Sequence, residues 1–85
     1  MKVAVKILPR KDVLDSQGRA VEKTLSQYGK SVQSCKVGKY IQLDFAGESE
    51  SQALAKAKDI AEFVLVNPLI ESFELELVPQ TSGDQ

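Results

Sequence analysis

The run LDSQGR at residues 14–19 holds the side chains in this sequence best suited to contact another molecule, together with a glycine that folding does not require. Gly18 lies in the first turns of a predicted helix. A glycine there is about 0.5–1 kcal/mol less favourable than alanine, so its presence indicates a close approach to the backbone. Arg19 can bind a partner carboxylate through two parallel hydrogen bonds. Two interpretations stay open: local capping by Asp15, or contact with a partner.

Other residues with reactive side chains do not form a catalytic set. The sequence has no histidine and one cysteine, Cys35, so no Cys-His pair can activate a nucleophile. We therefore expect Cys35 to be a buried apolar thiol. Glu71, Glu74 and Glu76 could suggest carboxylate chemistry, but general acid–base catalysis needs a pocket, and Glu74 and Glu76 alternate along a strand face. We therefore expect these carboxylates to lie on a solvated face. The chain thus lacks the usual catalytic residues, and if it serves an enzyme, we expect it to do so as a partner.

A single glycine precedes Lys39 and Tyr40, and no glycine-rich phosphate loop occurs anywhere in the sequence. We predict that Gly38 and Lys39 form a type II′ hairpin turn. Tyr40 and Phe45 fall on opposite faces of their strand, and the aromatic and basic pattern of RNA-binding sheets is missing. With a net charge of −1, the chain is not expected to bind nucleic acid or an anionic membrane.

The length and the hydropathy pattern indicate one small domain. The chain has 85 residues, and no apolar run is long enough for a signal peptide or a membrane span, so we expect a cytoplasmic protein. A single domain is predicted over residues 1–79. Residues 80–85 have no large apolar side chain and are predicted to be a disordered tail.

Six elements follow from the hydrophobic periodicity. Strands are predicted at residues 2–8, 32–37, 40–46 and 73–78, and helices at 15–28 and 50–66. Gly29 is expected to cap the first helix in the left-handed conformation, and the buried face of the second is predicted to hold Ala53, Ala57, Ile60, Ala61 and Val64. The order β-α-β-β-α-β predicts an α+β, ferredoxin-like sandwich: a four-stranded antiparallel sheet with two helices on one face. The open sheet face, or an exposed edge strand, can receive another chain.

Three runs carry a resemblance to a known family. They are KDVLDSQGRAVE at residues 11–22, VGKYI at 37–41 and NPLIE at 67–71, and with this spacing the chain resembles the PurS family from about residue 2 to 78. PurS is the small subunit of phosphoribosylformylglycinamidine (FGAM) synthase. Ser16 stands where the family usually has proline, which we expect to loosen the start of the helix slightly.

The resemblance implies a non-catalytic subunit that associates through its sheets into a homodimer or tetramer. It also implies two partners: a glutaminase subunit, PurQ, and an ATP-dependent synthetase subunit, PurL, which together convert formylglycinamide ribonucleotide, glutamine and ATP into FGAM. The complex would use ATP and Mg²⁺, and this chain would bind no cofactor or metal. It would hold the partners together and assist ammonia transfer. We predict that the contact with the large subunit comprises Leu14, Asp15, Gln17, Gly18, Arg19, Gly38, Lys39, Asn67 and Pro68.

Two other classes share the predicted order of elements. An ACT-like, small-molecule-sensing dimerisation module is the main alternative, although the position after the first strand, where such domains often have a glycine, holds Pro9 and Arg10. An acylphosphatase-like hydrolase needs a phosphate-binding loop at that point, and Pro9 lacks the N–H that such a loop would use.

Overall fold

The computed structural model describes residues 1–79 of the chain, and the predicted tail at 80–85 lies outside the described residues. The elements are β1 (Lys2–Pro9), α1 (Ser16–Gln27), β2 (Lys39–Asp44), α2 (Glu50–Ile60), a π-helical turn η1 (Ala61–Leu65) and β3 (Glu71–Val78). The chain is therefore an α+β protein with two helices and an antiparallel sheet, as predicted. No helix of the described part is long and apolar enough to cross a membrane.

The sheet has three strands in the order β2-β1-β3, and both neighbouring pairs are antiparallel. The prediction of a fourth strand at residues 32–37 is wrong. This segment is extended but unpaired, because two of its backbone N–H groups donate to carboxylates of residues 15 and 22 instead of to a neighbouring strand. The three observed strands keep the relative order that a ferredoxin-like sandwich gives them, and an edge strand is absent.

One helix covers the sheet. Helix α2 packs on β1 and β3, where Ala53 and Ala57 are fully buried against Val3. A second group of buried residues, Val5, Ile7, Ala61 and Val66, continues the core along the same face. The small alanine side chains let the helix approach the sheet closely, so the core is thin and sensitive to added volume.

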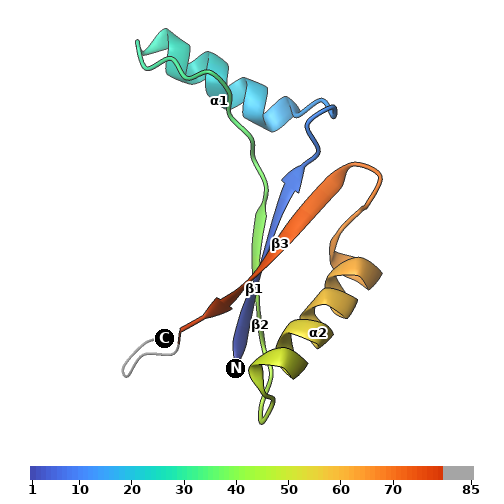
Figure 1. Ribbon diagram of the computed structural model, residues 1–85. Helices are drawn as coiled ribbons and strands as arrows, with labels where there is room; N and C mark the ends of the chain where they lie inside the picture. Colours follow the sequence, from blue (N-terminus) through green and yellow to red (C-terminus); the bar gives the residue numbers. More distant parts are fainter. Residues whose placement is uncertain (80–85) are drawn as a thin grey trace.

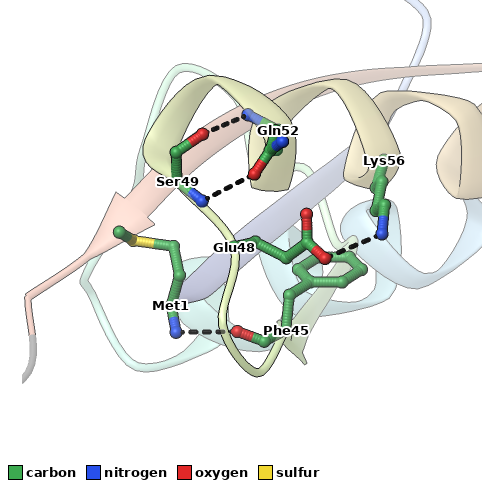
Figure 2. Close-up of polar contacts among 6 residues, drawn as sticks. All are labelled: Met1, Phe45, Glu48, Ser49, Gln52 and Lys56. Carbon is green, nitrogen blue, oxygen red and sulfur yellow. Dashed lines mark hydrogen bonds and ion pairs between the residues drawn. The ribbon is translucent and has the colours of Figure 1, made fainter.

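The start of α2 is fixed by polar contacts (Figure 2). The Ser49 hydroxyl accepts from the Gln52 backbone N–H at 3.3 Å, and the Gln52 side chain accepts from the Ser49 N–H at 3.1 Å, which together form a capping box. Beside it, Lys56 Nζ lies 2.8 Å from Glu48 Oε2. The N-terminal amino group donates to the Phe45 carbonyl at 3.0 Å, which ties β1 to the end of β2.

The prediction that Val64 lies on the buried face of the second helix is wrong. The helix runs to Leu65, close to the predicted end, but its last turn is π-helical. Because a π-turn holds more residues than an α-turn, it rotates the positions that follow. Leu65 and Val66 consequently take the inner positions, whereas Val64 is 64% exposed.

Helix α1 lies beyond one end of the sheet and does not cover a sheet face (Figure 1). The prediction of two helices on one face is therefore wrong for the single chain. Residues 29–38 run back along α1 towards β2, so that helix and return segment form a projecting arm, residues 14–37. The chain is elongated as a result: its radius of gyration is 16.1 Å, against about 12 Å for a compact chain of this length.

The predicted hairpin at Gly38 and Lys39 is also wrong. A type II′ turn needs a positive φ at Gly38, and Gly38 is not among the residues of positive φ. A Cβ at this position would instead collide with the Ile7 carbonyl oxygen. Gly38 is therefore needed where the return segment passes close to β1, immediately before β2 begins.

Candidate functional site

The first turn of α1 is fixed by a carboxylate that binds two separate parts of the backbone. Asp15 Oδ1 accepts from the Gly18 N–H and Oδ2 from the Val37 N–H, each at 2.9 Å. The predicted N-cap is thus confirmed, and Asp15 also fastens the return segment to the helix. These backbone donors, Gly18 first and Val37 second, hold the pKa of the Asp15 carboxyl below its usual value.

A second carboxylate repeats this arrangement about two turns further along the helix. Glu22 Oε2 accepts from the Cys35 N–H at 2.8 Å. Cys35 itself is half-buried, which differs from the buried thiol that the sequence suggested. The arm is therefore held together by side-chain-to-backbone hydrogen bonds and has almost no buried core, since Gly18 is the one buried residue of α1.

Gly18 is required by the chain itself. A Cβ at this position would collide with the Cys35 carbonyl oxygen and would lie 2.6 Å from Asp15 Oδ2. The expected close approach to Gly18 is confirmed, and the approaching group is the return segment. At Asp15 and Gly18 the local structural interpretation accounts for the residue types, whereas contact with a partner stays a prediction.

Five of the predicted contact residues line one cleft of about 250 Å³ at the end of the sheet. They are Leu14, Asp15, Gln17, Gly38 and Lys39. The floor includes Ile7 and Pro9 at the end of β1, and the opposite wall includes Ile70 and Glu71 at the start of β3. Three stretches that lie far apart in the sequence are thereby brought together. We call this cleft and the turn at residues 67–71 the corner.

Glu71 joins the turn at residues 67–71 to Lys39, whereas the sequence predicted a solvated carboxylate at this position. Its Oε1 accepts from the Asn67 N–H at 2.8 Å, and its Oε2 lies 3.5 Å from Lys39 Nζ. The Glu71 side chain is 17% exposed, in contrast to the solvated residues Glu74 and Glu76 on the same strand. The Asn67-Pro68 pair marks a turn in the sequence, but it does not show that the Glu71 side chain binds back to that turn.

Arg10 is a second residue that the sequence reasoning missed. Its backbone N–H donates to the Ile70 carbonyl at 2.9 Å, and its Nε donates to the Pro68 carbonyl at 2.8 Å. The turn itself is closed by Asn67, whose side chain accepts from the Leu69 N–H at 3.1 Å. Asn67 and Pro68 are therefore held next to the cleft, although they do not line it.

Arg19 is the predicted contact residue that the structure places elsewhere. It lines a separate, open hollow on α1 with Glu22, Lys23 and Ser26. Within residues 1–79, no three Cys, Asp or Glu side chains converge as a metal site would require. The carboxylates of the corner, Asp15 and Glu71, already accept backbone hydrogen bonds, so they hold the return segment and the turn at residues 67–71 in place.

Comparison with known proteins agrees with the resemblance seen in the sequence. The sequence model of the family PurS, phosphoribosylformylglycinamidine (FGAM) synthase, matches residues 2–79. The PurS subunit of Thermotoga maritima is 32% identical over 75 residues, which cover 87% of this chain and 92% of that protein. The solved structure of Thermus thermophilus PurS superposes with a TM-score of 0.78 at 33% identity, over 92% of this chain and 96% of the other.

A chain in the structure of PurLQS from Thermotoga maritima is similar as well. It has a TM-score of 0.80 at 30% identity, over 88% of this chain and 93% of that chain. The match therefore covers nearly the whole described fold, including all three runs that meet at the corner. The chain belongs to the PurS family of FGAM synthase subunits.

Proposed function

We propose that this chain is the small, non-catalytic subunit of an FGAM synthase complex of purine biosynthesis. In that complex it holds a PurQ-type glutaminase and a PurL-type, ATP-dependent synthetase together and assists ammonia transfer between them. Family membership over residues 2–79 and similarity to a chain of PurLQS support this role. The observation that carries it is the corner, where residues 14–17, 38–39 and 67–71 form one rigid surface.

A rigid surface suits this role because ammonia that reaches water is diluted and protonated. Two active sites held in a fixed, water-excluding arrangement retain it, and this needs positioning more than side-chain chemistry. The corner can supply the contact: Leu14 is 66% exposed, Gln17 is exposed, and Lys39 is anchored to Glu71. We assign this surface to the large subunit, with Arg19 as a separate polar contact on α1.

The arm supports a second part of the proposal, self-association. Its apolar residues lack cover in the single chain: Val21 is 39% exposed, Tyr28 75% and Val32 48%. A second copy that covers the arm would also supply a neighbour for the free edge of β2, where the predicted fourth strand is absent, and would complete the ferredoxin-like sandwich. We therefore propose a homodimer, or a tetramer built from two such dimers.

The remaining features of the proposal concern cofactors and compartment. ATP and Mg²⁺ belong to the large subunit of the complex, and this chain binds neither. The purified chain is inactive by itself. We also place the complex in the cytoplasm.

Reconstitution with the two partner subunits tests the proposal. We expect native mass spectrometry, in the presence of glutamine, ATP and Mg²⁺, to show a complex that contains all three proteins. FGAM synthesis from glutamine should depend on this chain, whereas synthesis from added ammonium chloride by the large subunit should not. A chain that enters no complex, or one whose omission leaves glutamine-dependent synthesis unchanged, would refute the proposal.

A matched pair of variants then tests the corner. Gln17→Ala removes an exposed amide from the cleft, and Ser51→Ala removes an exposed hydroxyl from the first turn of α2, away from the corner, the arm and the sheet. We expect Gln17→Ala to weaken assembly with the large subunit about tenfold, the effect of losing one polar contact. Ser51→Ala should leave assembly unchanged. Equal behaviour of the two variants would contradict the assignment of the corner.

A further inference from the structure

A second exposed apolar surface lies where α2 ends and the chain turns towards β3. The described residues expose ten large apolar side chains, and four of them fall within residues 63–70: Phe63, Val64, Leu69 and Ile70. Phe63 and Leu69 are 84% and 83% exposed. Large apolar residues concentrated in one exposed stretch, with an aromatic among them, are typical of a protein-binding surface. We call this stretch the 63–70 surface.

Local structure holds these side chains outward. The π-helical turn moves Val64 off the core face, and π-turns are frequent at functional sites. In the following turn, Asn67 accepts from the Ile70 and Glu71 N–H groups at 3.1 and 2.7 Å, and Arg10 fastens the Pro68 and Ile70 carbonyls. Leu69 is therefore presented by a turn that is hydrogen-bonded at both ends, and binding would order it little further.

A hollow of about 490 Å³ is lined in part by Val66 and Pro68 of the same stretch. Val66, Pro68 and Phe73 provide its apolar lining, and Arg10, Glu62 and Glu71 provide its charges. Each of the two carboxylates has a lysine partner, Lys58 for Glu62 at 3.6 Å and Lys39 for Glu71 at 3.5 Å.

Arg10 differs from these paired charges. Within residues 1–79 it forms no ion pair, and its one side-chain hydrogen bond uses Nε. Both terminal nitrogens of the guanidinium group thus stay available, in the geometry that binds a carboxylate. The hollow consequently fits an apolar side chain that stands next to a carboxylate.

We infer that the 63–70 surface and its hollow bind the large synthetase subunit, which inserts an apolar side chain beside an acidic one. The inference rests on the proposed function and extends the contact beyond the corner. Glu71 lines both the corner cleft and this hollow, so one partner can cover them continuously. A stable interface buries about 800 Å² on each side, more than the small cleft provides. We place a second copy at the arm instead, where Val21, Tyr28 and Val32 lack cover beside the free edge of β2.

Site-specific photo-crosslinking identifies the occupant directly. Phe63, which lies outside the corner, is replaced by benzoylphenylalanine in the full chain, which is assembled with both partner subunits, glutamine, ATP and Mg²⁺ and then irradiated. We expect a covalent adduct with the large subunit. An adduct with the glutaminase, an adduct with a second copy of this chain, or no adduct within an intact complex would each overturn the inference while leaving the proposed function standing.

Three variants give the energetic test. Phe63→Ser combined with Leu69→Ser should weaken binding to the large subunit at least 100-fold, because two exposed anchors are lost. Arg10→Leu should weaken it about tenfold and reduce its salt dependence. Ala55→Ser, at an exposed position of α2 outside the corner, the arm and the sheet, is the control and should bind as the wild type does.

Circular dichroism and a thermal melt show whether each variant is folded before binding is measured. Wild-type affinity retained by the folded Phe63→Ser, Leu69→Ser double variant would refute the inference. If the wild-type chain itself fails to bind, the proposed function is refuted instead, and the two failures are thereby distinguished.

Discussion

Replacing Gly18 by alanine has two opposite effects on the stability of the chain. Alanine is about 1 kcal/mol more favourable than glycine within a helix, so helix propensity alone predicts that Gly18→Ala stabilises the chain. The structure predicts the opposite result. The new Cβ would collide with the carbonyl oxygen of Cys35, which is a backbone atom and cannot rotate away as a long side chain could.

The size of the loss follows from what must move. Relief of the collision pushes the return segment off α1, and this lengthens the hydrogen bonds from Val37 N–H to Asp15 and from Cys35 N–H to Glu22, now 2.9 and 2.8 Å. Added volume at a tightly packed position costs about 1–3 kcal/mol. After the gain in helix propensity, we expect a net destabilisation of about 1 kcal/mol.

Urea unfolding followed by circular dichroism measures this difference. All variants are compared at one protein concentration, because self-association would make stability depend on concentration. Thr24→Ala, at an exposed position of the same helix, is the control and should gain about 0.5 kcal/mol from helix propensity alone. If Gly18→Ala gains stability as the control does, the close packing of the return segment on α1 is refuted.

Three further predictions follow from the contacts described. Backbone donors lower the pKa of Asp15 in the folded chain below the usual 3.8, so the Asp15 carboxylate stabilises the fold fully above that pH. This stabilisation is lost as the pH falls through the pKa of the folded chain. The urea midpoints of wild type and Asp15→Asn should therefore converge in acid. Ala57→Leu should destabilise the chain by about 1–3 kcal/mol because Ala57 is fully buried, whereas Ala55→Leu, at an exposed position of the same helix, should change little; thermal melts compare them. Ser49→Ala removes the capping box and should cost about 1 kcal/mol in urea unfolding.

Much of the fold could be predicted because it depends on neighbours in the sequence. Alternating side chains marked β1 and β3, and Pro9 and Pro79 marked where they end. Asp15 as N-cap, and Gly29 with a φ of 71° at the end of α1, follow from preferences that act within a few residues.

The errors arose where distant residues decide the structure. The segment at 32–37 has the composition of a weak strand, but its N–H groups are taken by carboxylates 13 and 22 positions earlier. Likewise, the apolar stripe of α1 predicted a helix packed on the sheet, whereas in the single chain that stripe is uncovered. Periodicity shows that a helix needs a partner surface and does not show which chain provides it.

The candidate site was predicted in part for a related reason. Five residues chosen from two of the runs line one cleft, yet the residues that hold the corner rigid, Arg10 and Glu71, were not chosen. Both bind backbone groups that lie far from helix α1 in the sequence. A sequence run that identifies a family can therefore contain the residues that shape a surface. It need not contain the residues that contact a partner.

Substitutions at Gly18 and Gln17 can separate the shape of the corner from direct contact with a partner. Gly18 is buried against the return segment, so a partner cannot rest on it while that segment stays in place, and any effect of Gly18→Ala on assembly must act through the position of residues 35–38. Gln17, its exposed neighbour, can act by direct contact. Assembly defects of Gly18→Ala should therefore track its loss of stability and diminish when the arm is stabilised by Thr24→Ala. The assembly defect of Gln17→Ala should persist although the stability of the chain is unchanged, because stabilising the arm does not restore a missing contact.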